Sequence, residues 1–311
     1  MLNPLFITPS LVIELFLTLI LFILFSIAFI ATLPFLKSSQ KTTTLTYKLE
    51  KKSHLIASLL SLSLFFKVLL LPFFIYNLNA LSSFIPGAMC SAGVVSSNEY
   101  GGVLIGLKFF LVFTLLLYGL FYKESQRIKA LYHSKKRHFL FIALYLFLVL
   151  EIVLEYLFYT NIPYNESVSC CSTLYTTTDS QAFSSLYLVG SFYFLYALLM
   201  LLNWFQKREL LALFSGVFLY SSYESVTYFF SSYIYELPSH KCPYCLLQSD
   251  YNYVGYFLYN SLFLATFYSF VQLLFKERDE HKKVLFFYTF FVLLLSYYFL
   301  SFLIRNGTTL W

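Results

Sequence analysis

Charged residues are scarce in this chain. Of its 311 residues, 12% are Asp, Glu, Lys or Arg, whereas an average soluble domain carries about 25%. Glycine (10) and proline (8) are also few, which excludes collagen-like and low-complexity disordered chains. Hydrophobic residues make up 59%, more apolar surface than a soluble fold of this length can bury. The composition therefore indicates an integral membrane protein.

Several well-known functional motifs are missing as well. The sequence contains no glycine-rich phosphate loop, no G-x-S-x-G elbow and no H-E-x-x-H, so it gives no support to ATP-driven or hydrolytic functions. Four of the five histidines lie in or beside loops rich in basic residues, and they form no haem-ligand pattern.

The apolar residues are gathered in eight runs, each long enough to cross a bilayer as a helix. The runs cover residues 11–36, 55–77, 103–122, 138–160, 184–205, 210–232, 251–275 and 284–304. The first run is too long for a signal-peptide core and no small-residue cleavage pattern follows it, so we expect it to be retained. The predicted fold class is all-α, a polytopic membrane helix bundle of about eight transmembrane helices.

Basic residues mark every second loop. Segments 37–54, 123–137, 207–208 and 276–283 together hold 17 of the 21 Lys and Arg residues. Basic residues in short loops stay in the cytoplasm, so both termini and the loops 78–102, 161–183 and 233–250 are expected on the non-cytoplasmic side. This orientation explains the net charge of +6, and no nucleic-acid partner is expected.

All five cysteines fall in these predicted outside loops. They are Cys90, Cys170, Cys171, Cys242 and Cys245. Disulfides form and exchange in an oxidising compartment such as the bacterial periplasm, so we predict a bacterial inner-membrane protein with its cysteine loops facing the periplasm. The alternative is a non-catalytic subunit of a larger membrane complex, in which bridged cysteines only staple the loops.

The strongest motif is Cys242-Pro243-Tyr244-Cys245, which we expect at the outer end of the seventh helix. Unpaired backbone N–H groups and the helix dipole would stabilise a thiolate there, and the neighbouring His240 and Lys241 would act in the same direction. The motif predicts a pair that cycles between dithiol and disulfide. C-x-x-C is also half of many zinc sites.

The remaining cysteines offer exchange partners. A bridge between the adjacent Cys170 and Cys171 would close a strained small ring, so one of them is expected to pair elsewhere, with Cys90 as the obvious candidate. Since five is an odd number, one thiol is left over, as an exchange relay requires.

The same outside residues are also soft metal ligands. Met89, Cys90, the Cys170-Cys171 pair, His240 and the C-P-Y-C motif suit copper(I), zinc or mercury. A metal-binding or metal-transport membrane protein is therefore the alternative function.

An outside loop with cysteines, two further helices and then C-P-Y-C-L-L resembles the vitamin K epoxide reductase and DsbB group of membrane thiol oxidoreductases. The resemblance covers about residues 138–275 and implies a four-helix redox core there, after an N-terminal three-helix segment (1–137) with the Cys90 loop and before a C-terminal helix (276–311). Cys90-Ser91-Ala92-Gly93-Val94-Val95-Ser96-Ser97 also resembles the loop that follows the first helix of that group.

The resemblance implies a mechanism. Cys245 would face a quinone cofactor in the membrane, while Cys242 would exchange with a loop cysteine. The loop cysteine would in turn oxidise an extracytoplasmic partner, a thioredoxin-like thiol protein or another dithiol substrate.

Six ionisable side chains fall inside the predicted spans, namely Glu14, Lys67, Lys108, Glu151, Glu155 and Glu224. Each costs about 2.5–3.5 kcal/mol at the bilayer centre on insertion scales, so they should face one another or a cavity. Glu151 and Glu155 are four residues apart and share a helix face. Lys108 and the outer glutamates could bind the head group of a quinone or conduct protons. Alternatively, Lys67 or Lys108 pairs with a glutamate and fixes the bundle.

Overall fold

A computed structural model describes residues 8–37, 43–127, 135–163, 165–168, 182–275 and 278–310 of the chain. Every regular element within these ranges is helical, which confirms the all-α prediction. Seven of the described helices are long and apolar enough to cross a membrane. The protein is therefore a multi-pass helical membrane protein. The side of the membrane that each loop faces stays a prediction from the basic residues.

The sixth predicted span, 210–232, is helical but is not among those seven. It comprises α8 (Arg208–Ser225), one π-helical turn η5 (Val226–Phe230) and α9 (Ser231–Tyr235). Serines and threonines recur along this segment and lower its hydropathy. Several of these hydroxyls donate to the carbonyl one turn earlier, as Thr227 does to Tyr223 and Ser231 does to Thr227.

The chain forms two compact units. Unit 1 comprises Met1–Pro86 and Val94–Val168, and unit 2 comprises Gly87–Gly93 and Ser169–Trp311. The boundaries predicted after residues 137 and 275 do not coincide with this division, because hydropathy does not reveal which helices pack together. In unit 2 the helices from residue 182 onward pack together, and the four-helix redox core at 138–275 stays a prediction.

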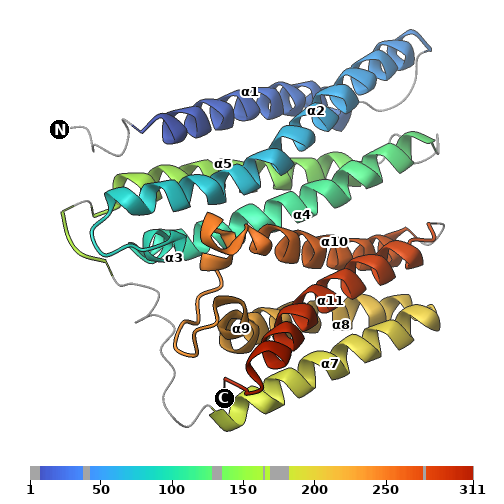
Figure 1. Cartoon of the computed structure of the whole chain (residues 1–311). Coiled ribbons are helices and arrows are strands. Elements are labelled where there is room, and N and C mark those ends of the chain that lie inside the picture. Colours follow the sequence, from blue (N-terminus) through green and yellow to red (C-terminus); the bar gives the residue numbers. More distant parts are fainter. Residues whose placement is uncertain are drawn as a thin grey trace. The chain divides into compact units, whose positions relative to one another are not determined.

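Unit 1 is built from four long helices. They are α1 (Pro9–Lys37), α2 (Thr43–Leu81), α4 (Tyr100–Arg127) and α5 (Lys135–Thr160). Each helix packs against two others, in the closed order α1, α2, α4, α5 and back to α1 (Figure 1). Phe25, Leu60, Leu115 and Phe141 are buried in the centre of this bundle.

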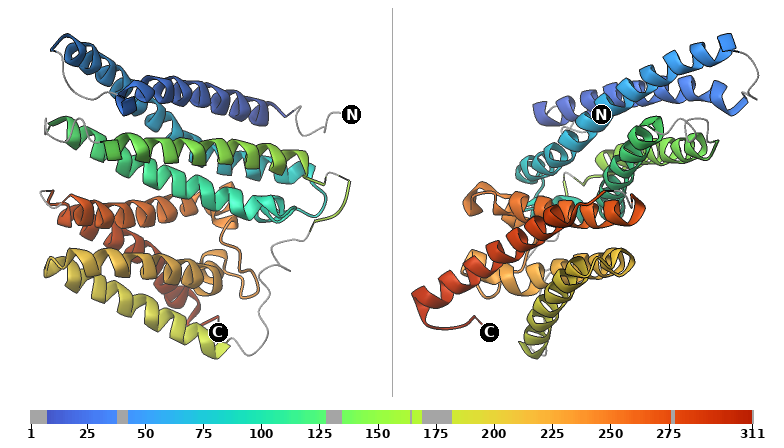
Figure 2. Two further views of the ribbon diagram at one scale, coloured as in Figure 1. Left: turned by 180° about the vertical axis from the view of Figure 1, so that it is seen from behind. Right: turned by 90° about the vertical axis from the view of Figure 1, so that its right-hand side faces the viewer.

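Unit 2 repeats this order of packing. Its helices α7 (Ala182–Trp204), α8 with α9, α10 (Val254–Leu274) and α11 (His281–Asn306) contact one another in a closed sequence, and α7 runs beside α8 in both views of Figure 2. The core is aromatic: the rings of Phe192, Phe218 and Phe291 lie 5.3 to 6.3 Å apart. Gly307, with φ 67°, ends α11 in the left-handed conformation that closes many helices.

Two irregular connections carry the described cysteines. The α2–α4 connection contains η2 (Ser82–Phe84), Cys90 and the short α3 (Ser91–Val95). The α9–α10 connection contains two 3₁₀ turns, η6 (Cys245–Leu247) and η7 (Ser249–Tyr251). Asn252 and Tyr253 are then both left-handed, with φ 52° and 54°, so the chain cannot run helically from C-P-Y-C into α10.

Candidate functional site: a buried cluster of three cysteines

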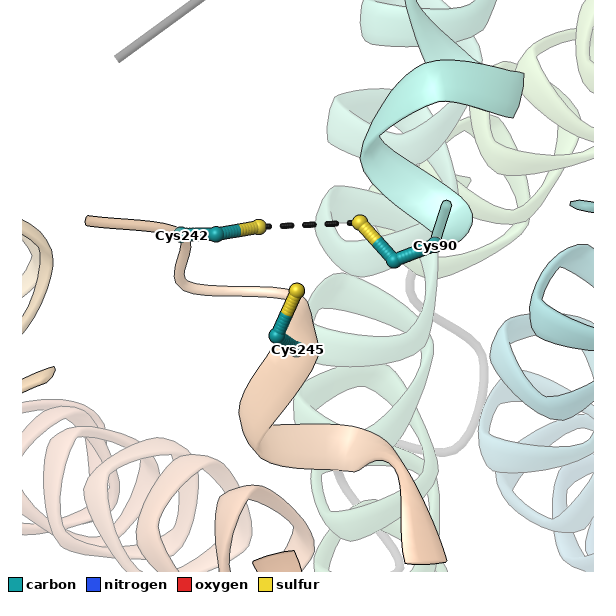
Figure 3. Close-up of side chains that lie close together, drawn as sticks. All are labelled: Cys90, Cys242 and Cys245. Carbon is teal, nitrogen blue, oxygen red and sulfur yellow. Dashed lines mark hydrogen bonds between the residues drawn. The ribbon is translucent and has the colours of Figure 1, made fainter. Parts of the chain in front are cut away.

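Cys90, Cys242 and Cys245 lie together within unit 2. Their three sulfur atoms are all within 4.8 Å of one another, and the Sγ atoms of Cys90 and Cys242 are 3.7 Å apart. Figure 3 shows the side chains converging from two loops. Cys170 and Cys171 lie outside the described residues. The structure therefore places Cys90, predicted to pair with one of them, beside Cys242.

The cluster is shielded from solvent. Cys90 and Cys242 are 0% exposed and Cys245 is 4% exposed, and all three belong to the apolar core of unit 2. Burial disfavours a thiolate because the charge loses its hydration. The site therefore favours the uncharged states of sulfur: thiol, disulfide, or thiolate neutralised by a bound cation.

The expected source of thiolate stabilisation is absent from the structure. C-P-Y-C was predicted to open the seventh helix, but Cys245 begins the three-residue turn η6 and α10 starts at Val254. A single 3₁₀ turn has few aligned peptide dipoles, so the helix-dipole argument is wrong here. Burial also lowers the pKa of Lys241.

Two tyrosines fix the backbone of C-P-Y-C. Tyr235 at the end of α9 donates a hydrogen bond to the carbonyl oxygen of Cys242, and Tyr259 on α10 donates to that of Pro243 at 2.7 Å. The ring of Tyr235 also packs edge-on against His240, with centroids 4.6 Å apart. The conformation of the motif is therefore set by helices on both sides of it.

The two cysteine loops are joined directly. Gln248 Nε2 donates to the carbonyl oxygen of Met89 at 3.1 Å. Gly255 in the first turn of α10 lies against Leu246, since a Cβ on the glycine would sit 2.9 Å from the Leu246 backbone. Sequence analysis missed Tyr235, Tyr259 and Gln248, because 28 tyrosines in one chain give no signal for any single one.

The phenols around the cluster stay protonated. Burial raises the pKa of Tyr235 and of Tyr244 well above the ordinary value, and Cys242 and Cys90 add to the effect at Tyr244. These hydroxyls therefore act as hydrogen-bond donors at physiological pH and do not accept protons as bases.

A cavity of about 240 Å³ lies between α10 and α11 in the same unit. Its walls are aromatic, with two polar side chains among them: Tyr256, Phe257, Asn260, Ser261, Leu264, Phe286, Phe287 and Phe290. Its volume is below the range of about 300–1,000 Å³ that is common for ligand pockets, although its apolar walls with few polar groups are typical of them. It was not foreseen from the sequence.

The charged residues predicted to bind a cofactor divide between the units. Lys108, Glu151 and Glu155 form ion pairs with one another in unit 1, whereas the cysteines belong to unit 2. Glu224 lies on α8 of unit 2, in the sixth predicted span, and is half-buried. The ion pairing weighed as an alternative is thus present, and Lys67 takes part in it.

No protein-family model, curated protein or solved structure matches this chain. The likeness of C-P-Y-C and its surroundings to the vitamin K epoxide reductase and DsbB group therefore stays a hypothesis based on short motifs.

Proposed function

We propose that the protein is an integral membrane thiol–disulfide oxidoreductase whose exchanging groups are Cys90, Cys242 and Cys245. The observation that carries this proposal is the approach of all three sulfur atoms to within 4.8 Å of one another. Disulfide exchange needs three sulfurs in one place: an attacking thiolate, the sulfur attacked and the sulfur that leaves.

The proposed exchange conserves electrons. Cys242 and Cys245 begin as a disulfide, and the Cys90 thiolate attacks Cys242 Sγ, which lies 3.7 Å away. The Cys242–Cys245 bond breaks, a Cys90–Cys242 disulfide forms and Cys245 leaves as a thiolate. The proton lost by Cys90 is balanced by the one that Cys245 takes up.

Net oxidation of a substrate needs an acceptor, for which we propose a membrane quinone. A bound quinone would supply the acceptor for the two electrons and two protons lost when two thiols form a disulfide. The aromatic cavity between α10 and α11 fits its ring, and Tyr256, Asn260 and Phe287 on its walls would hold it. Tyr259, on the same helix, holds Pro243.

The substrate is proposed to be an extracytoplasmic dithiol, such as a thioredoxin-like protein. Since the three sulfurs are buried, such a partner would react first at Cys170 or Cys171, which lie outside the described residues. The predicted orientation in a bacterial inner membrane would place these loops in the periplasm.

The test measures disulfide formation in an added dithiol protein, with the purified full chain in lipid and a soluble quinone analogue. Cys242→Ser and Cys245→Ser should each abolish oxidation. Cys245→Ser should also lack the Cys90–Cys242 disulfide, as checked by peptide mass spectrometry, because the exchange that forms this bond needs Cys245 as the leaving sulfur. Ser249→Ala, at an exposed neighbouring position, is the matched control. Undiminished oxidation by Cys242→Ser would refute the proposal.

A soft-metal site is the second candidate, favoured by one distance. Two thiolates on one zinc at about 2.3 Å in tetrahedral geometry lie about 3.8 Å apart, close to the 3.7 Å between Cys90 and Cys242. Three buried thiolates also suit copper(I). Stoichiometric metal in the reduced protein that is lost in Cys242→Ser, together with unchanged dithiol oxidation, would favour this function.

The predicted orientation has its own test. In a variant that lacks the five native cysteines, a reporter cysteine replaces Ser83 or Gln206, both at exposed positions. A membrane-impermeant maleimide applied to intact cells should label the reporter at Ser83 and leave the one at Gln206 unlabelled until the membrane is opened. The opposite pattern would invert the orientation and remove the cysteines from an oxidising compartment.

A further inference from the structure

Unit 1 encloses a polar network in the middle of its apolar bundle. All four of its long helices contribute a charged side chain that is at most 7% exposed: Glu14, Lys67, Lys108, Glu151 and Glu155. Lys67 Nζ lies 2.6 Å from Glu151 Oε2, and Lys108 Nζ lies 3.0 Å from Glu151 Oε1 and 2.7 Å from Glu155 Oε2.

The charges in this network do not balance if every group is ionised. Two ammonium groups face three carboxylates, and both lysines contact Glu151 or Glu155. Glu14 is therefore the surplus acid, 1% exposed within a membrane-spanning helix. Because an unpaired charge is costly inside the bilayer, the balanced state of the network is the one in which Glu14 carries a proton.

The partners of Glu14 serve both of its protonation states. Asn77 Nδ2 donates to one of its carboxyl oxygens, and the Tyr159 hydroxyl lies 3.1 to 3.2 Å from both. Asn77 Oδ1 is buried with no hydrogen-bond partner among the described residues. A 180° turn of this amide, which crystallographers routinely consider, would present Oδ1 as the acceptor for a protonated Glu14.

A small cavity borders the same carboxyl. A cavity of about 10 Å³ is lined by Glu14, Thr18, Lys67, Leu70, Leu71, Lys108, Val112 and Glu151, and this volume is close to the smallest that holds one water molecule. Glu155 Oε1 is also buried without a donor in the part of the chain described. The network therefore has hydrogen-bonding capacity that its own side chains do not use.

We propose that Glu14 is a proton-binding site inside the membrane-spanning part of unit 1. As the neutral acid it donates to Asn77. When it releases its proton to water in the cavity, it becomes a carboxylate that accepts from Asn77 and Tyr159, and the network changes from neutral to one negative charge. The groups that face it are Asn77, Lys67, Lys108, Glu151, Glu155 and Tyr159. This site does not depend on the thiol chemistry of unit 2.

The experiment is a pH titration of the full chain in lipid, followed by infrared spectroscopy of the carbonyl stretch of protonated carboxylic acids. The native protein should show one buried acid band that disappears as the pH rises. Glu14→Gln should lose this band, since the amide is neutral and isosteric with the acid. Glu99→Gln, at an exposed position, is the matched control and should keep it.

A second variant keeps the test decisive if Glu14→Gln fails to fold. Tyr159→Phe removes one donor that stabilises the carboxylate, and should move the midpoint of the band upward by about one to two pH units. A native titration that is identical in Glu14→Gln would overturn the proposal. So would a midpoint that Tyr159→Phe leaves in place, because both results would mean that the titrating acid is a group other than Glu14.

Discussion

The two units share one architecture and differ in what they bury. In each, four long helices pack in a closed order, and an irregular connection joins the second helix to the third. Among the described residues, every buried lysine and glutamate lies in unit 1. The interior of unit 2 holds aromatic rings, hydroxyls and the three cysteine sulfurs.

This difference shows that the same packing order of membrane helices can enclose different kinds of interior side chain. Lipid is as apolar as a leucine side chain, so bundles are held by close packing and polar contacts more than by the hydrophobic effect. Unit 1 uses ion pairs for this purpose, and unit 2 uses aromatic contacts. Substitutions should therefore affect the two units differently.

The largest expected effect is that of Glu151→Gln in unit 1. This carboxylate contacts both Lys67 and Lys108, and breaking a buried ion pair by removing one partner costs about 3–5 kcal/mol. We expect that loss in the free energy of unfolding, measured by denaturant titration in detergent. Glu224→Gln, at a half-buried position of α8, is the control and should not lower stability, because it removes a charge that costs free energy inside the membrane.

The double variant Lys67→Met with Glu151→Gln sharpens this prediction. It removes one charge of each sign and leaves Lys108 paired with Glu155, so it should recover most of the lost stability. Equal stability of Glu151→Gln and Glu224→Gln would show that unit 1 does not depend on its ion pairs.

The next-largest effect is expected from alanine substitutions of two glycines, one after each irregular connection. Gly101 on α4 and Gly255 on α10 each open the third long helix of their unit, and each faces backbone that a Cβ would meet, that of Val95 and of Leu246. Overpacking costs about 1–3 kcal/mol, so both alanine variants should be destabilised. Gly216→Ala, which meets nothing within 4 Å, should be neutral.

The functional consequence of these glycine variants should differ. Gly255→Ala pushes on Leu246, the neighbour of Cys245, and should slow dithiol oxidation as well as lower stability. Gly216→Ala should alter neither quantity. If Gly255→Ala kept full stability, the close contact between α10 and η6 would not exist in the folded protein.

Much of the fold follows from the sequence alone. A helix that crosses a bilayer needs about 20 mostly apolar residues, and hydropathy detects such runs. All eight predicted runs are helical in the structure. Ion pairing of Lys67 or Lys108 with a glutamate was one of the two interpretations of the charged residues inside the spans. Which helices form a unit was not predictable, since hydropathy does not show which span packs against which.

The candidate site was only partly predictable for a different reason. The sequence placed its cysteines in three loops, but the path of a loop depends on the packing of distant helices. The approach of Cys90 to Cys242 therefore came from the structure. The left-handed pair Asn252 and Tyr253 also separates C-P-Y-C from α10, although both residues fall in the apolar run 251–275 that predicted a helix.

A smaller effect is expected from Tyr259→Phe. The variant loses the hydrogen bond to the Pro243 carbonyl, worth about 0.5–1.5 kcal/mol, and it frees the backbone of C-P-Y-C. We expect slower dithiol oxidation at nearly unchanged quinone dependence. Tyr196→Phe removes a comparable bond, to Thr289 at 3.0 Å, between helices α7 and α11. It should lower stability equally without slowing oxidation, and equal slowing in both variants would deny Tyr259 a positioning role.

The smallest effect is expected from the ion pair on the surface of unit 2. Arg305 lies 2.7 Å from Glu236, but the two side chains are 59% and 49% exposed. Water and salt screen such a pair, so Arg305→Gln should change the free energy of unfolding by about 0–1 kcal/mol, with less effect at high salt. The distance is similar to those of the Glu151 pairs in unit 1, 2.6 Å to Lys67 and 3.0 Å to Lys108, so a difference in effect would point to burial and to the number of paired charges. A loss as large as that of Glu151→Gln would mean that geometry, and not burial, sets the strength of ion pairs in this protein.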